Sequence, residues 1–530
     1  MNLAHAVGHK WMLSFKGDTP PADLLQTIAR HPIAGVSLYR SLNVKNPAQV
    51  RDLNHALQRA ARASNQPPLL IAADQETGTL FAIPQTTPFP GNLATAATRD
   101  PKLARRMGYA VGRELAAMGV NVNFAPVCDV NINPKNSVIG ARSFGEDVEL
   151  VSHMAAAYIG GLQEAGVAAT AKHFPGHGDT ALDSHYGTPI VDHDGARLRA
   201  IEFPPFRAAI DAGTRLVLTA HLALPKLDSH GDLPATLSPT ILQTILRGEL
   251  GFRGVIITDA MDMASISQDL GIIVDSIAAA VAGVDIFLAG PAQAGSAVIY
   301  DALLHAAQRN LLSTAELDAS AARILELKEW CARISAADLS VVNCAEHNAL
   351  ANEIAARSIT LVRDQSSQLP LQLDSTSRVL VIVPTPQDLT PADTSSYEHV
   401  ALAAALREFH THVDEIELPI NPSADDLAAV REKFKEYACI VIGTINAADY
   451  PNQAALVNLA LQENPRTIVV ALRMPYDLQC FAQAPTYLCT YSIQAPSLRA
   501  CARVIFGQAT ATGELPVSIP ELYTLKRGII

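Results

Sequence analysis

Residues 166–185 read GVAATAKHFPGHGDTALDSH and join an apolar run directly to a polar loop. The first six residues are typical of a buried strand, and Pro175, Gly176 and Gly178 then interrupt regular structure. The titratable side chains of this stretch are denser than anywhere else in the chain: Lys172, His173, His177, Asp179, Asp183 and His185. Because enzymes place reactive groups on loops that rigid elements hold, we interpret it as a catalytic loop.

Apolar runs of this kind recur along the first part of the chain, at intervals too long for hairpins. The eight predicted strands are 11–15, 34–39, 68–74, 120–127, 166–171, 215–220, 254–259 and 283–289. Helical spacing of apolar residues appears between them, as in 100–119, 150–166 and 238–251. This alternation predicts parallel strands joined by helices.

Eight β/α units fit a (β/α)8 barrel of the TIM type, which usually takes about 250 residues. The pattern alone leaves an open doubly wound sheet as an alternative. A barrel carries its catalytic residues where strands end and loops begin. Polar residues at such positions are Asp74, Lys172, His173, His221 and Asp259.

The chain after the predicted barrel changes character. Residues 359–377 carry Ser, Gln and Pro without clear periodicity, and we interpret 346–377 as a connecting segment between a barrel at 1–345 and a second domain at 378–530. Four strand-like runs then alternate with helical ones: 378–384, 438–444, 466–472 and 486–492, with helices at 399–410 and 452–463. They predict a smaller αβα-layered domain.

Composition narrows the possible partners. The 530 residues are 49% hydrophobic and 17% charged, with a net charge of −12 and no sustained cluster of Lys and Arg. Nucleic-acid binding needs a basic surface, so we expect a small neutral or mildly polar ligand instead. The sequence leaves the oligomeric state open, and a homo-oligomer is one possibility.

Seven scattered cysteines, with no CxxC pair, favour a reduced, cytoplasmic protein without a zinc motif. The first residues lack the basic and apolar regions of a signal peptide, and no run of about 18 uncharged apolar residues follows. We therefore expect neither export nor a membrane span. No GxxxxGK[ST] loop and no GxGxxG after an early strand occurs, so we expect no nucleotide cofactor.

Two carboxylates and one imidazole are candidates for acid–base and nucleophilic chemistry. Asp183 precedes His185 by two residues, so that it could orient the ring and raise its basicity, although both residues also suit an ordinary surface loop. Asp259 ends the run VIITD and is either a nucleophile or a helix N-cap. For Asp262, three residues on, capping is the preferred interpretation.

A metal site is the alternative for the titratable loop. Its ligands would be His173, His177, Asp179, Asp183 and His185. Zinc hydrolases usually draw paired histidines from one helical turn or strand, whereas Gly and Pro between these residues fix no such geometry. We therefore predict no metal.

Asp74 and Arg142 are interpreted as a clamp for sugar hydroxyls.

The motif KHFPGHGDTALDSH, with DQETG (74–78) before it and ITDAMDM (257–263) after it, resembles the bacterial β-N-acetylglucosaminidases of glycoside hydrolase family 3. The likeness extends over most of the predicted barrel. Its further segments there are 121–147, 216–228, 233–242 and 249–261. Residues 346–377, 441–453, 469–478 and 513–520 are similar to the second, αβα-sandwich domain of two-domain members.

The resemblance implies a retaining exo-hydrolase that removes terminal β-linked N-acetylglucosamine from muropeptide or chitooligosaccharide fragments. It implies Asp259 as nucleophile and His185, held by Asp183, as acid and base. The implied sugar-binding residues are Asp74, Arg142, Lys172 and His173. A phosphorylase that uses the same dyad, or a sugar-binding barrel without catalysis, are the alternatives.

Two departures from the family pattern stand out. Relatives usually read DQEGGRV where this chain reads Asp74 to Leu80, so Thr79 stands in place of an arginine. A contact to substrate is thus missing or supplied elsewhere. Ala260 follows the implied nucleophile where many members carry Asp or Trp, which leaves the aglycone preference open.

Overall fold

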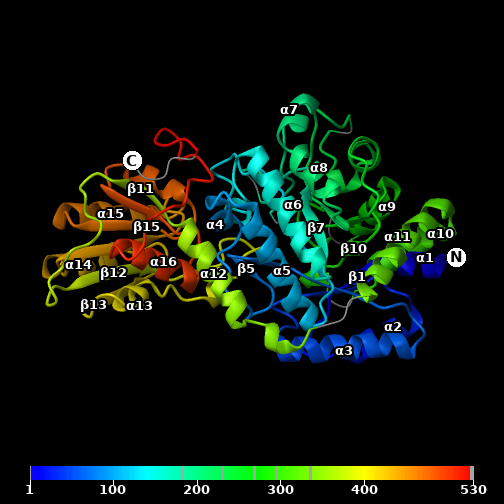
Figure 1. Ribbon diagram of the computed structural model, residues 1–530. Helices are drawn as coiled ribbons and strands as arrows, with labels where there is room; N and C mark the ends of the chain where they lie inside the picture. The colour runs from blue at the N-terminus through cyan, green and yellow to red at the C-terminus, as the bar shows by residue number, and fades with distance from the viewer. Residues whose placement is uncertain are drawn as a thin grey trace.

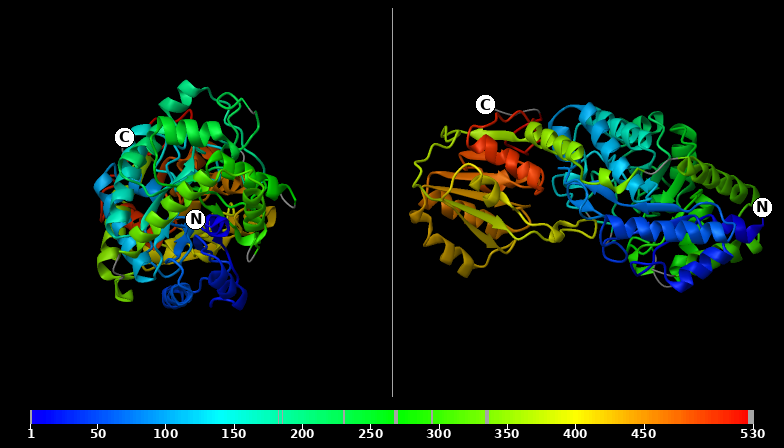
Figure 2. Two further views of the ribbon diagram at one scale, coloured as in Figure 1. Left: turned by 90° about the vertical axis from the view of Figure 1, so that its right-hand side faces the viewer. Right: turned by 60° about the horizontal axis from the view of Figure 1, so that its bottom comes forward.

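The computed structural model describes residues 2–181, 183–184, 186–229, 231–266, 270–293, 296–333 and 337–525. The chain forms two α/β units that lie side by side, with helix α12 (Ala345–Ser358) between them (Figure 1). The view from below shows the two lobes separately (Figure 2, right).

The first unit is a nearly closed barrel of eight parallel strands. They are β1 (Trp11–Leu13), β2 (Gly35–Leu38), β3 (Leu70–Ala73), β6 (Val122–Asn123), β7 (Ala168–Phe174), β8 (Leu216–Thr219), β9 (Val255–Thr258) and β10 (Phe287–Leu288). Their order is β10-β1-β2-β3-β6-β7-β8-β9, and a parallel bridge between Ile257 and Ile286 joins the two ends. The barrel prediction is confirmed, and the open-sheet alternative is wrong.

Alternation along the strands separates the barrel interior from the layer of helices. On β9, Val255 and Ile257 join the interior cluster, whereas Ile256 packs in the cluster under the helices. Because side chains alternate along a strand, the next inward position after Ile257 is Asp259, at the carboxyl end of the strand. The same alternation leads from Leu70 and Ala72 to Asp74 on β3.

Helices surround the barrel on its outside (Figure 2, left). The α-helices are α1 (Leu3–Gly8), α2 (Ala22–Arg30), α3 (Pro47–Ala63), α4 (Asn92–Ala97), α5 (Pro101–Ala117), α6 (Val148–Glu164), α7 (Gly195–Ala200), α8 (Phe203–Asp211), α9 (Gly271–Ala282), α10 (Val298–Gln308) and α11 (Thr314–Ala332). A π-helix, η3, spans Thr240–Glu249, and short 3₁₀ turns are η1 (Gly140–Arg142), η2 (Ala235–Leu237), η4 (Pro291–Gln293) and η5 (Leu339–Val341).

Glycines let helices α5 and α6 approach each other closely. A Cβ at Gly108 would lie 2.3 Å from the carbonyl oxygen of Tyr158, and one at Gly161 would lie 1.9 Å from that of Arg105. Any side chain at either position would therefore push the two helices apart.

The second unit is a six-stranded sheet between two layers of helices. Its strands, in the order β11-β16-β15-β14-β12-β13, are β11 (Thr360–Asp364), β16 (Thr486–Cys489), β15 (Thr467–Ala471), β14 (Cys439–Thr444), β12 (Val379–Pro384) and β13 (Val413–Leu418). Its helices are α13 (Leu402–Arg407), α14 (Ala424–Arg431), α15 (Pro451–Glu463) and α16 (Ala495–Ile505), with 3₁₀ turns η6 (Ser395–Tyr397), η7 (Phe434–Glu436) and η8 (Pro475–Phe481). The αβα-sandwich prediction is confirmed.

Two strands of this sheet differ from the sequence prediction. Residues 346–377 were predicted to connect the domains, but they include most of α12 and the whole of β11, which pairs antiparallel with β16 at one edge of the sheet. The opposite edge strand, β13, was not predicted, because its sequence VDEIEL carries three acidic residues. Charged side chains are common on edge strands, where they discourage further pairing. The domain boundaries themselves stay predictions.

Polar contacts join α12 to the barrel. His347 Nδ1 lies 2.8 Å from Glu114 Oε1, and the hydroxyl of Thr87 donates to the same oxygen over 2.5 Å. All three side chains are buried.

Within the described residues, no helix is long and apolar enough to cross a membrane.

Candidate active site

A cavity of about 480 Å³ opens at the carboxyl ends of the barrel strands. Five of the predicted site residues line it: Asp74, Arg142, Lys172, His173 and Asp259. Residues of the second unit, among them Asp393, Thr394 and Tyr397, line the same cavity. The sequence placed the catalytic residues at strand ends, and the cavity lies at that end of the barrel.

The carboxylate of Glu76 holds the two cations at the base of the site. Glu76 belongs to the short strand β4 (Gln75–Thr77), which pairs with β5 (Leu80–Phe81) directly after barrel strand β3. Arg142 binds it through two hydrogen bonds of 2.8 Å, and Lys172 Nζ lies 2.5 Å from Oε1. Burial alone would raise the pKa of Glu76, but Arg142 and Lys172 hold it far below its usual value.

Lys172 also reaches Asp74, the residue that ends strand β3. Its Nζ atom donates to Asp74 Oδ1 over 2.6 Å, while the Lys172 side chain itself is 2% exposed. Burial acts to lower the pKa of Lys172, and Asp74 and Glu76 raise it above its usual value. The ammonium group is therefore charged and fixed, and about a quarter of the Asp74 side chain (26%) remains open to the cavity.

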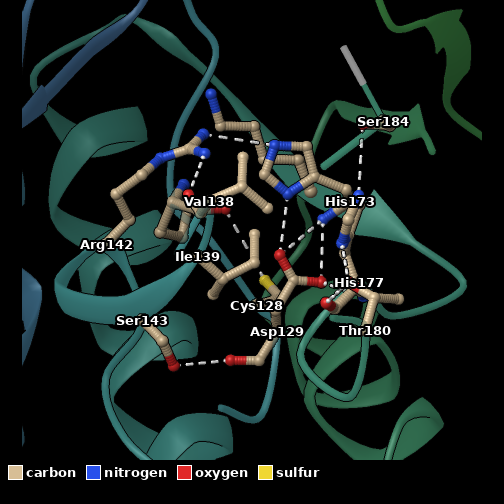
Figure 3. Close-up of polar contacts among 12 residues, drawn as sticks. Cys128, Asp129, Val138, Ile139, Arg142, Ser143, His173, His177, Thr180 and Ser184 are labelled. Carbon is tan, nitrogen blue, oxygen red and sulfur yellow. Dashed lines mark hydrogen bonds and ion pairs between the residues drawn. The ribbon is translucent and has the colours of Figure 1, made fainter. Parts of the chain in front are cut away.

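His173 lies between a carboxylate and a guanidinium (Figure 3). Its Nδ1 is 2.7 Å from Asp129 Oδ2, and its Nε2 is 3.3 Å from Arg142 Nη2. Because a guanidinium only donates, Nε2 accepts, and the ring proton lies on Nδ1, where it is donated to Asp129. The two partners thus fix both the orientation and the tautomer of the ring.

Asp129 also anchors the start of the catalytic loop. Its Oδ1 accepts the backbone N–H of His177 over 2.7 Å. Burial acts to raise the pKa of Asp129, but the hydrogen bonds and charges of His173 and His177 lower it. One carboxylate therefore holds both His173, which lines the cavity, and the loop that follows it.

His177 ties the catalytic loop to itself (Figure 3). Its Nδ1 lies 2.7 Å from the hydroxyl of Thr180, and its Nε2 lies 3.2 Å from the hydroxyl of Ser184. The side-chain amide of Asn136 donates to its carbonyl over 2.8 Å. Burial, together with the neighbouring His173, lowers the pKa of His177 to about 4. At neutral pH the ring is uncharged, and its two nitrogen atoms hold Thr180 and Ser184 of the same loop.

The predicted proton-transfer dyad is only partly described. Asp183 is buried, with 7% of its surface exposed, and its carbonyl accepts the N–H of Tyr186 over 3.0 Å. His185 lies outside the described residues. Asp179 is placed away from the cavity lining and contacts His193 Nε2 over 2.6 Å.

Asp259 directly follows strand β9, two residues beyond the interior residue Ile257. Its Oδ1 accepts the N–H of Ala260 over 2.8 Å. His221, also a strand-end residue, is buried beside this turn and donates from Nε2 to the carbonyl of Ala260 over 3.2 Å. The predicted cap Asp262 accepts the N–H of Ala292 over 2.6 Å and also lines the cavity.

Glu76 and Asp129 were not predicted as site residues. Glu76 follows Asp74 by two positions, and Asp129 follows the predicted strand 120–127 by two. Each was therefore a carboxylate near a strand end, which is the signal that identified Asp74 and Asp259. Their partners lie 66 and 44 residues away in the chain, however, so that only the fold reveals the pairing.

In the described part of the chain, no group of three His, Cys, Asp or Glu side chains is arranged to hold a metal ion. Of the five residues of the alternative metal interpretation, His185 lies outside the described residues. His173 and His177 contact Asp129 and loop hydroxyls, and Asp179 contacts His193.

A carboxylate beside a fixed network of charged hydrogen-bonding groups lies at the carboxyl ends of the strands of an eight-stranded barrel, which is where enzymes of this fold carry their active sites. The chain belongs to glycosyl hydrolase family 3, because residues 11–327 match the model described as the glycosyl hydrolase family 3 N terminal domain. The family resemblance seen in the sequence is thereby confirmed.

Named relatives agree with this assignment. A β-hexosaminidase A of Pseudoalteromonas piscicida is 33% identical over 98% of this chain and 97% of its own length. A β-hexosaminidase of Alkalilimnicola ehrlichii is 39% identical over 46% of this chain and 70% of its own length. The solved family 3 β-N-acetylglucosaminidase of Paenibacillus sp. str. FPU-7 superposes with a TM-score of 0.92 at 35% identity, covering 98% of this chain and 99% of the other.

We predict that Glu76→Gln destabilises the barrel by about 3–5 kcal/mol, because it removes the charge that neutralises buried Lys172 and Arg142. The matched control is Glu164→Gln, since Glu164 also pairs with an arginine but has 54% of its side chain exposed. That variant should cost about 0.5 kcal/mol. Urea unfolding at pH 7 measures both, and equal losses would contradict the role of Glu76.

We predict that His177 makes the protein less stable in mild acid. Its pKa is about 4 in the folded protein and 6.5 in the unfolded chain, so that the unfolded state takes up a proton first as the pH falls below 6.5. The loss should reach about 3 kcal/mol by pH 4. Urea unfolding at pH 7 and pH 5 should show a smaller pH dependence for His177→Asn than for the unsubstituted protein. An unchanged dependence would refute this.

Proposed function

We propose that the protein is a retaining exo-β-N-acetylglucosaminidase. The observation that carries the proposal is a single cavity that Asp259 lines together with Lys172, Arg142 and His173, of which Lys172 and Arg142 pair with the buried Glu76. The printed names of the relatives, β-hexosaminidase and β-N-acetylglucosaminidase, support the choice of sugar. The resemblance seen in the sequence points to the same activity.

The network suits the recognition of one terminal sugar. Asp74, Lys172, Arg142 and His173 present charged or tautomer-fixed groups to the cavity, and their positions are set before a ligand arrives. Sugar hydroxyls need directed donors and acceptors, and groups that are already oriented lose little entropy on binding. Residues of both units line the cavity, and the exo mode of action is proposed from the family resemblance.

The proposed mechanism has two steps. Asp259 attacks the anomeric carbon and forms a covalent glycosyl-enzyme, while His185 protonates the leaving oxygen. His185 then deprotonates the water that displaces Asp259, and Asp183 orients its ring. An imidazole adds no second negative charge near Asp259, unlike the second carboxylate that most glycosidases use.

The proposed substrates are muropeptide or chitooligosaccharide fragments that end in β-linked N-acetylglucosamine. We further propose that the protein acts in the cytoplasm. All seven cysteines are free thiols, and burial raises the pKa of Cys331 and Cys501 to about 12, as expected of unreactive thiols in a reducing compartment.

The test of this function is the release of sugar from a chromogenic β-N-acetylglucosaminide and from chitobiose. The product should be free N-acetylglucosamine of retained configuration, both in buffer and with added phosphate. Formation of a sugar 1-phosphate in phosphate would instead identify a phosphorylase, and binding without turnover would identify a sugar-binding barrel.

We predict that Asp259→Asn lowers kcat by about 10³-fold or more, because an amide cannot form the glycosyl ester. Asp262→Asn is the matched control, since Asp262 is a second carboxylate of the same turn and cavity, and it should lose less than about tenfold. Mass spectrometry of a peptide containing Asp259 after incubation with a slow substrate should show the attached sugar. Full activity of Asp259→Asn would exclude it as the nucleophile.

We predict that His185→Ala affects natural and activated substrates unequally. Loss of a proton donor should lower kcat/KM for chitobiose by about 10²–10⁴-fold, but much less for an aryl glycoside whose phenolate leaves without full protonation. Comparing the two kcat/KM values checks this. Equal losses on both substrates would rule out the acid role of His185.

A further inference from the structure

Helix α9 is apolar on both of its sides. Its buried side packs on the barrel through Ile272, Ala279 and Ala282. Its only charged residue is Asp275, and its one hydroxyl, on Ser276, donates to the carbonyl of Ile272 over 2.7 Å. Surface helices normally turn polar side chains to solvent, whereas a helix that is apolar all round is normally buried. The composition of α9 therefore indicates that a partner covers its outer side.

The outer side of α9 carries a regular apolar stripe. Leu270, the N-cap residue, is followed by Val274, Ile277 and Val281 at spacings of four, three and four residues. Leu270, Val274 and Val281 are 80%, 66% and 49% exposed. This is the spacing at which paired helices place their contact residues, with valine alternating with leucine or isoleucine. The stripe is thus suited to packing against another helix.

A groove of about 550 Å³ lies beside this stripe, between α9 and α10. Ile273 and Ile277 line it from α9, and Ala302 and Ala306 line it from α10. Leu311, which follows α10, also lines the groove and is 62% exposed. We call the stripe and the groove together the α9–α10 face. Both helices lie on the side of the barrel away from the second unit (Figure 1), so that a second molecule can approach this face without meeting that unit.

The polar side chains of the groove are arranged in a self-complementary way. Asp301, His305 and Arg309 line it from α10 at intervals of four residues, and all three are exposed. Residues at this spacing lie on one side of a helix, and eight residues span about 12 Å. The groove is therefore acidic near the start of α10 and basic at its end. A second copy, turned by a two-fold axis, would place its arginine opposite Asp301 and its aspartate opposite Arg309.

We propose that the α9–α10 face is the contact surface of a symmetric homodimer. In this dimer α9 of each chain packs antiparallel against its copy, and Asp301 pairs with Arg309 across the two-fold axis. Helix α9 has 12 residues and is therefore about 18 Å long. A face two helices wide at that length is smaller than the roughly 800 Å² per partner of a tight complex. We therefore expect a weak dimer, with a Kd on the order of 10 μM.

The first test is sedimentation velocity of the full chain from about 1 to about 200 μM, which brackets the expected Kd. The mean mass should rise from that of one chain toward twice that value. A mass of one chain throughout would overturn the proposal. Binding of such a monomer to phosphatidylcholine vesicles, lost in Val274→Glu, would assign the face to a lipid surface instead.

The apolar stripe is tested by Val274→Glu. A carboxylate in the contact would lose its hydration, so the Kd should rise by about 100-fold or more. Because Val274 is 66% exposed in the single chain, circular dichroism and urea unfolding should remain unchanged. The matched control is Leu25→Glu, which alters an exposed apolar residue of helix α2 (37% exposed) and should leave the Kd unchanged. Equal Kd values for Val274→Glu and the unsubstituted protein would contradict the proposed contact.

The antiparallel arrangement is tested by exchanging the two charges. Asp301→Arg and Arg309→Asp should each raise the Kd by about tenfold, because each places like charges opposite one another at two symmetric positions. The double variant restores both pairs and should return the Kd to within about threefold of the original value. A double variant as weak as the single variants would overturn the proposed two-fold arrangement.

Discussion

The active-site arrangement depends on one buried carboxylate. Glu76 accepts two hydrogen bonds from Arg142 and one ion pair from Lys172, and all three side chains are almost fully buried. Without Glu76, the two cations inside the barrel would keep the partly exposed Asp74 beside Lys172 and the more distant charge of Asp129 near Arg142. Through Arg142 the same carboxylate also fixes His173, whose ring in turn contacts Asp129. Each charged or polar group of this network therefore has its full set of hydrogen-bond partners only when all the others are present.

The second unit completes the cavity that the barrel begins. A TIM-like barrel on its own has loops around an open mouth. Here residues 388–398 are hydrogen-bonded to the hairpin β4–β5 and present Tyr397 to the cavity. Thr79, the position where relatives usually carry arginine, provides its carbonyl for this contact. The departure from the family motif therefore coincides with the place where the two units meet.

Local pattern predicted the fold well because the strands of a parallel barrel are buried, apolar and regularly spaced. Each of the eight predicted runs overlaps one observed barrel strand, although β7 continues to Phe174, three residues beyond the predicted run 166–171, and Asp74 and Asp259 follow from strand ends alone. Arg142 was predicted to contact sugar, and the structure adds that it mainly holds Glu76. What the sequence could not supply were pairings across long separations, such as Asp129 with His173 or Tyr397 with Arg40, since these depend on how loops from different units meet.

The hairpin β4–β5 links the charged network to the second unit. Glu76 and Thr79 are three residues apart on this hairpin, one facing the charged network and the other bonded to the second unit. The hairpin therefore places a contact between the two units within a few residues of the charged network at the base of the cavity.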